Sequence, residues 1–371
     1  MLGSTTRPGQ VVGHDRWPAA PVAALAPVTT SVPELLEKFL AARVAELVRI
    51  DPALAQVGEE VGGIALSGGK RLRPAFVYWG HRATGADHDD AVLVPATAVE
   101  LLHTFALIHD DVMDRSPERH GRPAVHTALA HIHTAESLVG DPDWFGVGGA
   151  ILAGDLAFVW ADELFDSAVM PSSVTDRARR VFTDLRIEVM AGQYLDLRLA
   201  GLPKAQDTDA LRVALLKSGR YTVTRPLQLG AAVGGGDEAL DAALCAFGDA
   251  IGVAFQLRDD ILGLFGDPDR TGKGVLEDLR EGKQTLLIVR AKALTDAAGR
   301  ALLDRVIGDP QLDEADADRA RQIIVDSGAL DAVEQILARR LDSARRALAP
   351  VPAPAGDALS ELADYALYRT V

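Results

Sequence analysis

Three aspartates, Asp110, Asp111 and Asp114, close an apolar segment in the stretch "FALIHDDVMD". On a helix, residues three and four positions apart are surface neighbours, so this spacing predicts that the three carboxylates share one patch. Like charges at such spacing repel one another, and a cation between them offsets the cost. Magnesium binds oxygen ligands and typically bridges one or two carboxylates to phosphate oxygens. The spacing therefore favours a magnesium site that receives a phosphate-bearing ligand.

A second acidic pair, Asp259 and Asp260, closes another apolar helical segment in "FQLRDDILGLFGD". One acidic helix end is usually a solvated surface. Two such ends, each able to hold metal, favour a clamp on one polyphosphate from two sides. The two groups are far apart in the sequence, so the fold must bring them together.

Cations that could contact a diphosphate stand in four places of this chain, whose formal net charge is -15. They are "SGGKRLRP" (67–74), Arg119 with Arg122, "LKSGRYT" (216–222) and "TGKGVLEDLREGKQT" (271–285). Glycine permits close backbone approach, and arginine offers a bidentate fork for phosphate. The overall negative charge argues against nucleic acid or an anionic membrane as the main partner, so an anionic substrate needs these local cations.

Helical periodicity dominates the elements that must position these residues. Ser31 and Glu34 have capping-box spacing and predict the start of a first helix. Further helical segments are predicted at 90–114, 150–169, 174–200, 208–234, 238–265, 283–306, 315–325 and 329–348. Gly- and Pro-rich joins predict loops at 140–149, 201–207, 234–237 and 349–356. Because no alternating strand pattern occurs, the predicted class is all-α.

The 371 residues and 48% hydrophobic content predict one all-α domain over residues 31–371 behind a disordered tail, residues 1–30. The tail is rich in Pro, Ala and Thr and lacks the pattern of a secretory signal. No run of about 18 uncharged apolar residues occurs, which argues against a transmembrane segment. The single cysteine, Cys245, cannot form an internal disulfide and fits a cytoplasmic location.

Six motifs carry a resemblance to a known family. "GGKRLRP", "HDDVMD", "GQYLD", "LKSGRYT", "FQLRDD" and "TGK" followed by "EGK" occur in the order typical of the trans-isoprenyl diphosphate synthases. From about residue 32 onward the chain closely resembles that family, and within it the geranylgeranyl-type enzymes. The resemblance implies an isoprenoid synthase-type helical bundle around a deep central cavity, usually a homodimer. It also implies a prenyltransferase that joins isopentenyl diphosphate to an allylic diphosphate, with Mg²⁺ expected as three ions bound with the diphosphate.

The resemblance further assigns roles by position. The residues expected to hold magnesium against the allylic diphosphate are Asp110, Asp111, Asp114, Asp259 and Asp260, assisted by Arg119, Lys217 and Lys273. The residues expected to bind isopentenyl diphosphate are Lys70, Arg73, His103 and His120. Lys283 would support the closed site, and Ser218, Tyr221 and Gln256 would lie near the reacting carbons. The expected reaction ionises the allylic diphosphate, adds isopentenyl diphosphate and loses a proton to the departing diphosphate, so no general base is assigned.

Two positions depart from the family pattern. The first acidic motif is usually followed by two arginines, but here the second position is His120, whose imidazole is mostly neutral at pH 7 if its pKa is unperturbed. The two open readings are weakened binding of isopentenyl diphosphate and full compensation by Lys70 and Arg73. In the second motif, Gly263 replaces a third aspartate. Either Asp267 faces the same way, or two carboxylates suffice with water completing the metal shell.

Product length is predicted from the residues one turn or so before Asp110, which a growing hydrocarbon tail would meet roughly 6–8 Å below the aspartates at 1.5 Å per residue. These residues are Phe105 and Ala106. In related enzymes a bulky residue followed by a small one at these places goes with twenty-carbon products, so geranylgeranyl diphosphate is expected. The alternative is that Phe105 is an ordinary core residue.

Three rival readings of the same motifs exist. A terpene cyclase shares the metal chemistry but needs no isopentenyl site, against which "GGKRLRP" speaks. A weakly active or non-catalytic subunit of a heteromeric synthase fits His120, although both acidic groups are retained. A metal phosphohydrolase built on His109 and Asp110 leaves the second acidic group and the cations without a purpose.

Overall fold

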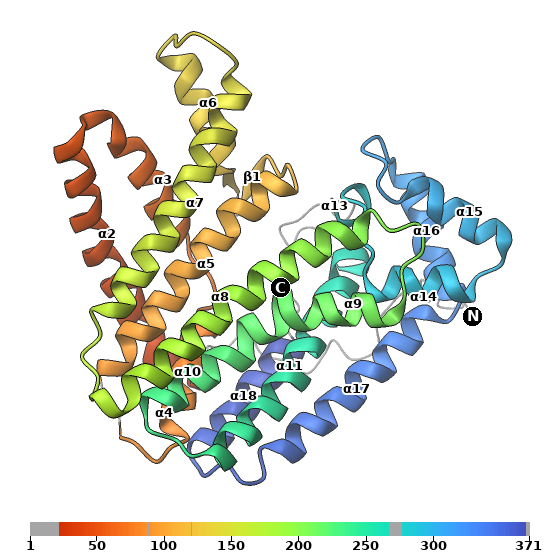
Figure 1. The fold of residues 1–371 in the computed structure, drawn as a ribbon. Helices are drawn as coiled ribbons and strands as arrows, with labels where there is room; N and C mark the ends of the chain where they lie inside the picture. The colour runs from red at the N-terminus through yellow and green to blue at the C-terminus, as the bar shows by residue number, and fades with distance from the viewer. Residues whose placement is uncertain (1–21, 88–89, 120, 267–276, 369–371) are drawn as a thin grey trace, which may run out of the picture.

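The computed structural model describes residues 22–87, 90–119, 121–266 and 277–368. This part of the chain is almost entirely helical, with one pair of two-residue strands (Figure 1). The predicted all-α class is confirmed. The strands, β1 (Glu118–Arg119) and β2 (Arg122–Pro123), form a small antiparallel hairpin that was not predicted, because strands of two residues leave no alternating pattern.

The elements in the first part of the chain are mostly short or of medium length. They are η2 (Ala23–Leu25), α1 (Ala26–Thr29), α2 (Ser31–Ile50), η3 (Pro52–Leu54), α3 (Ala55–Leu66), α4 (Leu72–Arg82), η4 (Asp90–Val92), α5 (Leu93–Met113) and α6 (Val125–Ala135). The remaining elements include the longest helices and one π-helix, η5. They are α7 (Pro142–Asp166), α8 (Ser172–Ala200), α9 (Asp207–Val213), η5 (Ala214–Thr224), α10 (Arg225–Val233), α11 (Glu238–Phe265), α13 (Glu277–Arg280), α14 (Leu286–Leu294), α15 (Ala297–Val306), α16 (Glu314–Asp326), α17 (Ala329–Ala347) and α18 (Ala355–Tyr368).

The long helices form the middle of the bundle. Helix α5 packs on α7, and α11 packs on η5 and α17, while α8 packs on η5 and α10. Figure 1 places α2 and α3 at one side of this group and α14 to α16 at the other. Helix α11 joins two apolar clusters, since Ile251 belongs to the larger one and Leu257 to the smaller one.

The π-helix interrupts one continuous helical run from residue 207 to residue 233. It lies unusually close to α11, because a Cβ atom on Gly252 would lie only 2.3 Å from Cα of Gly219. A side chain on Gly252 would not fit, and a Cβ atom on Gly219 would lie 3.1 Å from the Gly252 carbonyl carbon, a tight contact. π-Helical turns are rare and often occur at functional sites. Here it carries Lys217, which pairs with α8, Ser218, which bonds to α11, and Tyr221, which contacts α4 and α5.

Residues 22–30 are not a disordered tail, which corrects the predicted domain boundary. They form η2 and α1, with Val28 fully buried. Trp79 Nε1 donates a hydrogen bond to the Ala24 carbonyl at 2.7 Å, and Glu361 Oε1 accepts one from the Ala23 amide at 3.0 Å. The sequence did not reveal these contacts, because they depend on partners far along the chain. Residues 1–21 lie outside the described part.

The predicted capping box at the first helix is wrong. The Ncap residue of α2 is Thr30, which makes no side-chain cap, and Ser31 is already helical. The Glu34 amide instead donates to the Thr30 carbonyl at 3.2 Å. Because Thr30 lies in the right-handed helical region directly after α1, the chain enters α2 without the extended residue that a capping box needs.

Two predicted boundaries also differ from the structure. The stretch 140–149 was expected to be a loop, but α7 begins at Pro142, since Asp141 accepts from the Asp143 amide at 3.0 Å and proline suits the first turn. The predicted helix 283–306 is two helices, because Asp296 caps α15 by accepting from the Gly299 amide at 2.8 Å. Asp141 thus starts a helix inside a segment rich in Gly and Pro, and Asp296 starts a new helix inside a segment with continuous apolar periodicity.

Two helices, α7 and α11, are long and apolar enough to cross a membrane by length and composition alone. The most apolar window of α11 is 56% buried and that of α7 is 39% buried inside the bundle. Core helices of a bundle pass the same test, so this is weak support for a membrane span.

Candidate active site

The two predicted acidic groups meet at one cavity of about 430 Å³, lined by α8, η5, α11 and the segment 283–286. Its charged and polar lining residues are Lys70, Arg73, Asp110, Asp196, Lys217, Ser218, Thr222, Gln256, Asp259, Asp260, Asp278, Lys283, Gln284 and Thr285. The fold thus places Asp110 and Asp259 on the same cavity, as the clamp reading requires. Cations and carboxylates alternate around it, which suits an anionic ligand bound through metal ions.

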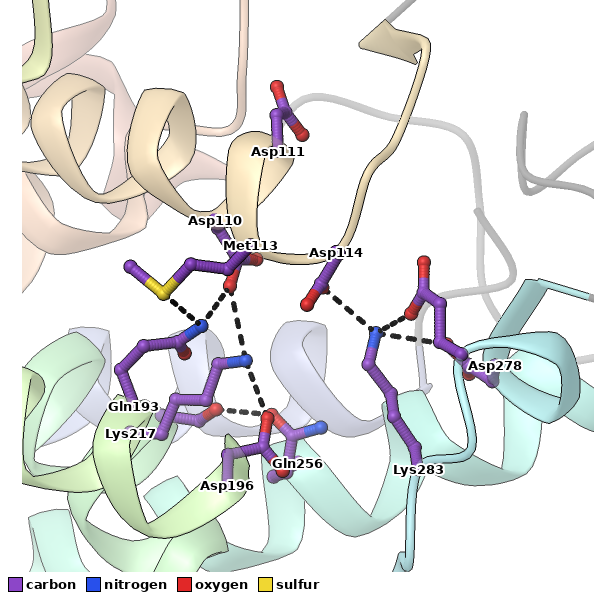
Figure 2. A network of polar contacts seen from close by, with 12 residues as sticks. Asp110, Asp111, Met113, Asp114, Gln193, Asp196, Lys217, Gln256, Asp278 and Lys283 are labelled. Carbon is purple, nitrogen blue, oxygen red and sulfur yellow. Dashed lines mark hydrogen bonds and ion pairs between the residues drawn. The ribbon is translucent and has the colours of Figure 1, made fainter. Parts of the chain in front are cut away.

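Asp110 stands at the end of α5 and faces this cavity. Its Oδ1 accepts a hydrogen bond from Gln193 Nε2 at 2.8 Å and lies 3.3 Å from Lys217 Nζ (Figure 2). Burial acts to raise the pKa of Asp110, but the charges of Lys217, Lys283 and Arg119 outweigh it and lower the pKa. Asp110 is therefore held as a carboxylate, the form that binds metal.

Asp111 does not share the patch, so the expectation that all three aspartates of the first group project together is wrong for this residue. Figure 2 shows its carboxylate directed away from Asp110 and Asp114. Its Oδ1 accepts from Arg119 Nε at 2.9 Å, and its Oδ2 is buried and has no hydrogen-bond partner among the described residues. The reason is its pairing with Arg119 of β1, which draws the carboxylate away from the other two aspartates. The pair holds the Arg119 guanidinium beside the acidic group.

Asp114 ends α5 and faces Lys283 across the cavity mouth, with Oδ2 3.6 Å from Lys283 Nζ. Burial, and then repulsion from Asp110, raises the pKa of Asp114 to about 6. Lys283 also lies 3.4 Å from Asp278 Oδ1 and pairs with Glu281. Although burial acts to lower the pKa of Lys283, these carboxylates raise it, so the lysine stays charged.

The second acidic group is held by a chain of side chains along α11. Gln256 Nε2 donates to Asp260 Oδ1 at 2.7 Å, and its Oε1 accepts from the Ser218 hydroxyl on the π-helix. Burial raises the pKa of Asp260 to about 8. Asp260 therefore has to release a proton when it binds a metal ion, which makes metal affinity depend on pH.

Lys217 joins α8 to α5 through two carboxylates. Its Nζ lies 2.7 Å from Asp196 Oδ2 and 3.3 Å from Asp110 Oδ1 (Figure 2). Asp196 and Gln193 come from the motif "GQYLD", which carried the resemblance but to which no role was assigned. Their spacing of three on one helix face was the available signal. Asp278 and Glu281 were likewise missed, because they stand inside a segment read only for its cations.

An adjoining cavity of about 270 Å³ shares Lys70, Arg73, Thr222 and Phe255 with the first and is also lined by His103. Arg73 donates to Thr222 Oγ1 at 3.0 Å, and its guanidinium carbon lies 4.5 Å from the centre of the Tyr221 ring. His103 Nδ1 lies 3.1 Å from the Tyr221 hydroxyl. Burial raises the pKa of Tyr221, so its hydroxyl remains protonated.

The "GGKRLRP" segment is shaped by residues in the left-handed region. Gly68, Gly69 and Arg71 have φ angles of +105°, +112° and +50°. Arg71 is buried, pairs with Glu100 of α5 and donates to the Ala65 carbonyl at 3.0 Å. This buried pair fixes the segment in a conformation that places Lys70 and Arg73 on the lining of both cavities.

Phe105 lies one and a half turns before Asp110 and is buried. Its ring centre is 5.1 Å from that of Phe158 and 4.9 Å from that of His109, both in edge contacts. Ala106 is half-buried against the larger apolar cluster. Neither residue lines the two cavities, so Phe105 belongs to an aromatic cluster beneath the acidic group.

Three residues singled out in the sequence, His120, Lys273 and Asp267, lie outside the described part of the chain. Within the described residues, no three His, Cys, Asp or Glu side chains are close enough to hold a metal ion by themselves. The charged oxygen groups around the cavity are the carboxylates of Asp110, Asp196, Asp259, Asp260 and Asp278. This set fits magnesium, which rarely occupies an all-protein cage and takes phosphate oxygens from its ligand.

The helical bundle and its cavity of opposed carboxylates and cations define an enzyme of the isoprenoid synthase class. The family model for polyprenyl synthetase matches residues 56–324. The chain belongs to this family, and its activity is that of a prenyltransferase.

Relatives and solved structures agree with this family. The chain is 37% identical over 310 residues to a geranylfarnesyl diphosphate synthase of Aeropyrum pernix, covering 82% of this chain and 91% of that protein. It is 35% identical over 297 residues to a geranylgeranyl diphosphate synthase of Mycobacterium tuberculosis, covering 80% and 79%. A geranylgeranyl pyrophosphate synthase from Corynebacterium glutamicum, solved with isoprenyl diphosphate and magnesium, superposes with a TM-score of 0.89 at 33% identity, covering 94% of this chain and all of that one.

Proposed function

We propose that this short-chain prenyltransferase condenses isopentenyl diphosphate with an allylic diphosphate to give geranylgeranyl diphosphate. The observation that carries the proposal is the meeting of Asp110 with Asp259 and Asp260 on one cavity that continues into a second cavity lined by Lys70, Arg73 and His103. One cavity has carboxylates for metal and lysines for diphosphate. The other has cations without the aspartates, as a second diphosphate bound without metal would need.

The allylic diphosphate is assigned to the first cavity. Asp110 and Asp114 on one side, and Asp259 and Asp260 on the other, would hold the magnesium ions. Bound magnesium would neutralise the negative charge that develops on the leaving diphosphate. Lys217, Lys283, Arg119 and, from its sequence position, Lys273 would contact the diphosphate from outside. The number of ions, expected as three, and a direct metal contact by Asp111 stay predictions.

Isopentenyl diphosphate is assigned to the second cavity, with Lys70, Arg73 and His103 as its contacts and His120 as a predicted fourth. Because the cavities share Phe255 and Thr222, the two substrates would meet at this boundary. Ser218 and Tyr221 lie on η5, which also carries Thr222. Gln256 lies on α11, which also carries Phe255. Their hydrogen bonds fix these groups in place before substrate arrives, which is how preorganised dipoles stabilise developing charge.

The reaction would begin with heterolysis of the allylic carbon–oxygen bond, for which the cations of this chain stabilise the departing diphosphate. The double bond of isopentenyl diphosphate then attacks the allylic cation, and the condensed cation loses a proton. Tyr221 is protonated and buried, so it is not the base. The departing diphosphate oxygens are the proposed proton acceptor.

The proposed product length of twenty carbons depends on Phe105. Together with Phe158, its ring would block further growth of the hydrocarbon tail. The aromatic cluster supports this role because it holds the Phe105 ring in place from α7. Relatives named for geranylfarnesyl, geranylgeranyl and farnesyl products all resemble this chain, so the length depends on such local residues.

We also propose a cytoplasmic homodimer. Exposed apolar side chains follow the outer face of α8 at spacings of three and four residues: Ile187, Met190, Tyr194 and Leu197. Such a stripe is unusual on a monomer and suits a second copy of the same helix. Light scattering on the purified protein should give twice the 39.3 kDa of one chain, and Tyr194→Asp should shift it toward one chain.

The function is tested by incubating the purified protein with magnesium, isopentenyl diphosphate and, separately, dimethylallyl, geranyl and farnesyl diphosphates, with products measured by mass spectrometry. A twenty-carbon diphosphate is expected. A diphosphate of another length would show that Phe105 does not limit the product to twenty carbons. Hydrocarbon formed from an allylic diphosphate alone would indicate a cyclase, and no condensation with any starter would indicate a subunit that needs a partner.

A further inference from the structure

Gly263 stands one helical turn after Asp259 and lines the same cavity. Glycine weakens the interior of a helix, so its presence in α11 calls for a reason. A Cβ atom at this position would lie 2.1 Å from Oδ2 of Asp278 and 3.2 Å from its Cγ. Side chains do not approach so closely. The Asp278 carboxylate therefore occupies the space that a side chain at position 263 would fill.

Asp278 reaches this place from α13, a separate segment of the chain. Its Oδ1 lies 3.4 Å from Lys283 Nζ, while its Oδ2 is directed at Gly263. Asp278, Asp259 and Asp260 all line the same cavity.

A simpler reading makes Asp278 only a partner for Lys283. That reading leaves Gly263 unexplained, because an ion pair with Lys283 needs no missing side chain on α11. Lys283 also has two other carboxylates nearby, Asp114 and Glu281. The two residues are explained together if Gly263 leaves the space one turn beyond Asp259 free, and Asp278 of α13 fills that space with its carboxylate.

We propose that Asp278 is the third carboxylate of the second acidic group, placed through the gap at Gly263 to bind magnesium directly or through its water shell. This inference rests on the proposed function, because it concerns the same diphosphate site. It predicts that a carboxylate at position 263 and one at position 278 are alternatives for one place. The carboxylate should therefore be movable from α13 to α11.

The test measures binding of inorganic pyrophosphate by titration calorimetry at a series of magnesium concentrations. Asp278→Ala should raise the magnesium concentration for half-maximal binding roughly tenfold, as loss of residues around a metal site typically does. The double variant Gly263→Asp with Asp278→Ala should recover most of that loss. Gly263→Asp alone crowds two carboxylates into one space and should lower the melting temperature more than the double variant does.

Controls separate a metal role from a structural one. Asp304→Asn removes the carboxylate near Lys292 at 2.9 Å, outside the cavity lining, and should leave the magnesium dependence unchanged. If Asp278→Ala is poorly folded, the near-isosteric Asp278→Asn is measured in its place. An unchanged magnesium dependence in the Asp278 variant, or no recovery in the double variant, would overturn the inference. Wild-type protein that binds no pyrophosphate with magnesium would overturn the proposed diphosphate site itself.

Discussion

Lys217 on the π-helix lies 2.7 Å from Asp196 on α8, and this ion pair directs the ammonium group toward the first acidic group on α5. Without Asp196, the lysine would lose the partner that fixes its position beside Asp110. Asp196 is therefore a positioning residue for the cation that, under the proposed function, would contact the allylic diphosphate. Its place in the cavity follows from α8 packing against the π-helix.

Asp196→Asn should weaken binding of the allylic substrate. A hydrogen bond to a charged group contributes about 1.5–3 kcal/mol, so the Michaelis constant for the allylic diphosphate should rise roughly ten- to a hundredfold. The constant for isopentenyl diphosphate should change much less, because Asp196 does not line the second cavity. Steady-state kinetics with each substrate varied in turn would check this. Equal effects on both constants would contradict a role through Lys217.

Phe105→Ala should lengthen the product, because it opens the aromatic cluster beneath Asp110. Product lengths by mass spectrometry give the readout. Phe247→Ala is the matched control, since Phe247 is fully buried and makes no contact in that cluster. Both variants should be less stable, by roughly 3–5 kcal/mol for a buried phenylalanine. Only Phe105→Ala should change the product, and an unchanged length would make Phe105 an ordinary core residue.

His120→Arg tests the first departure from the family pattern. If the imidazole binds isopentenyl diphosphate weakly, arginine should lower the Michaelis constant for that substrate, by roughly ten- to a hundredfold if it gains one full charge-assisted contact of about 1.5–3 kcal/mol. The wild-type constant should also improve below about pH 6.5, where an unperturbed imidazole gains charge. An unchanged constant in the variant would mean that Lys70 and Arg73 suffice.

Acid should destabilise the protein through Glu188, which joins α8 to the run containing the π-helix. Its Oε2 accepts from Arg225 Nε at 2.8 Å, and its Oε1 from Arg220 Nη1 at 2.9 Å. Burial acts to raise the pKa of Glu188, but the bonds and charges of these arginines outweigh it and lower the pKa. A lowered folded-state pKa gives stability that is present above the unfolded value of 4.5 and is lost as pH falls through the folded value.

Chemical denaturation at a series of pH values measures this effect. The free energy of unfolding should fall below about pH 4.5, and Glu188→Gln should lose roughly 1.5–3 kcal/mol at pH 7 with a flatter acid limb. Glu314→Gln, an exposed partner of Arg321, is the control and should change little. An acid limb that is as steep in Glu188→Gln as in the wild type would assign the loss to other groups.

Much of the fold could be predicted because long helices have a clear apolar periodicity in the sequence. Asp110 and Asp259 were found because charges that close an apolar helix are conspicuous. The Asp111 orientation could not be predicted from spacing of three and four alone, since it depends on the pairing of Asp111 with Arg119, which the hairpin after α5 supplies. Asp278 and Asp196 were missed because their partners, Gly263 and Lys217, are supplied by other segments. Contacts of this kind depend on the packing of helices rather than on local pattern.

The most direct test of the central claim is anomalous diffraction from crystals soaked with manganese, in place of magnesium, and inorganic pyrophosphate. The account predicts manganese peaks between the two acidic groups, with oxygens of Asp110 and of Asp259 at the short distance, about 2.1 Å, typical of magnesium-like ions. Pyrophosphate should lie between those ions and Lys217. Peaks confined to one acidic group, or located away from this cavity, would contradict the claim that both groups clamp one diphosphate.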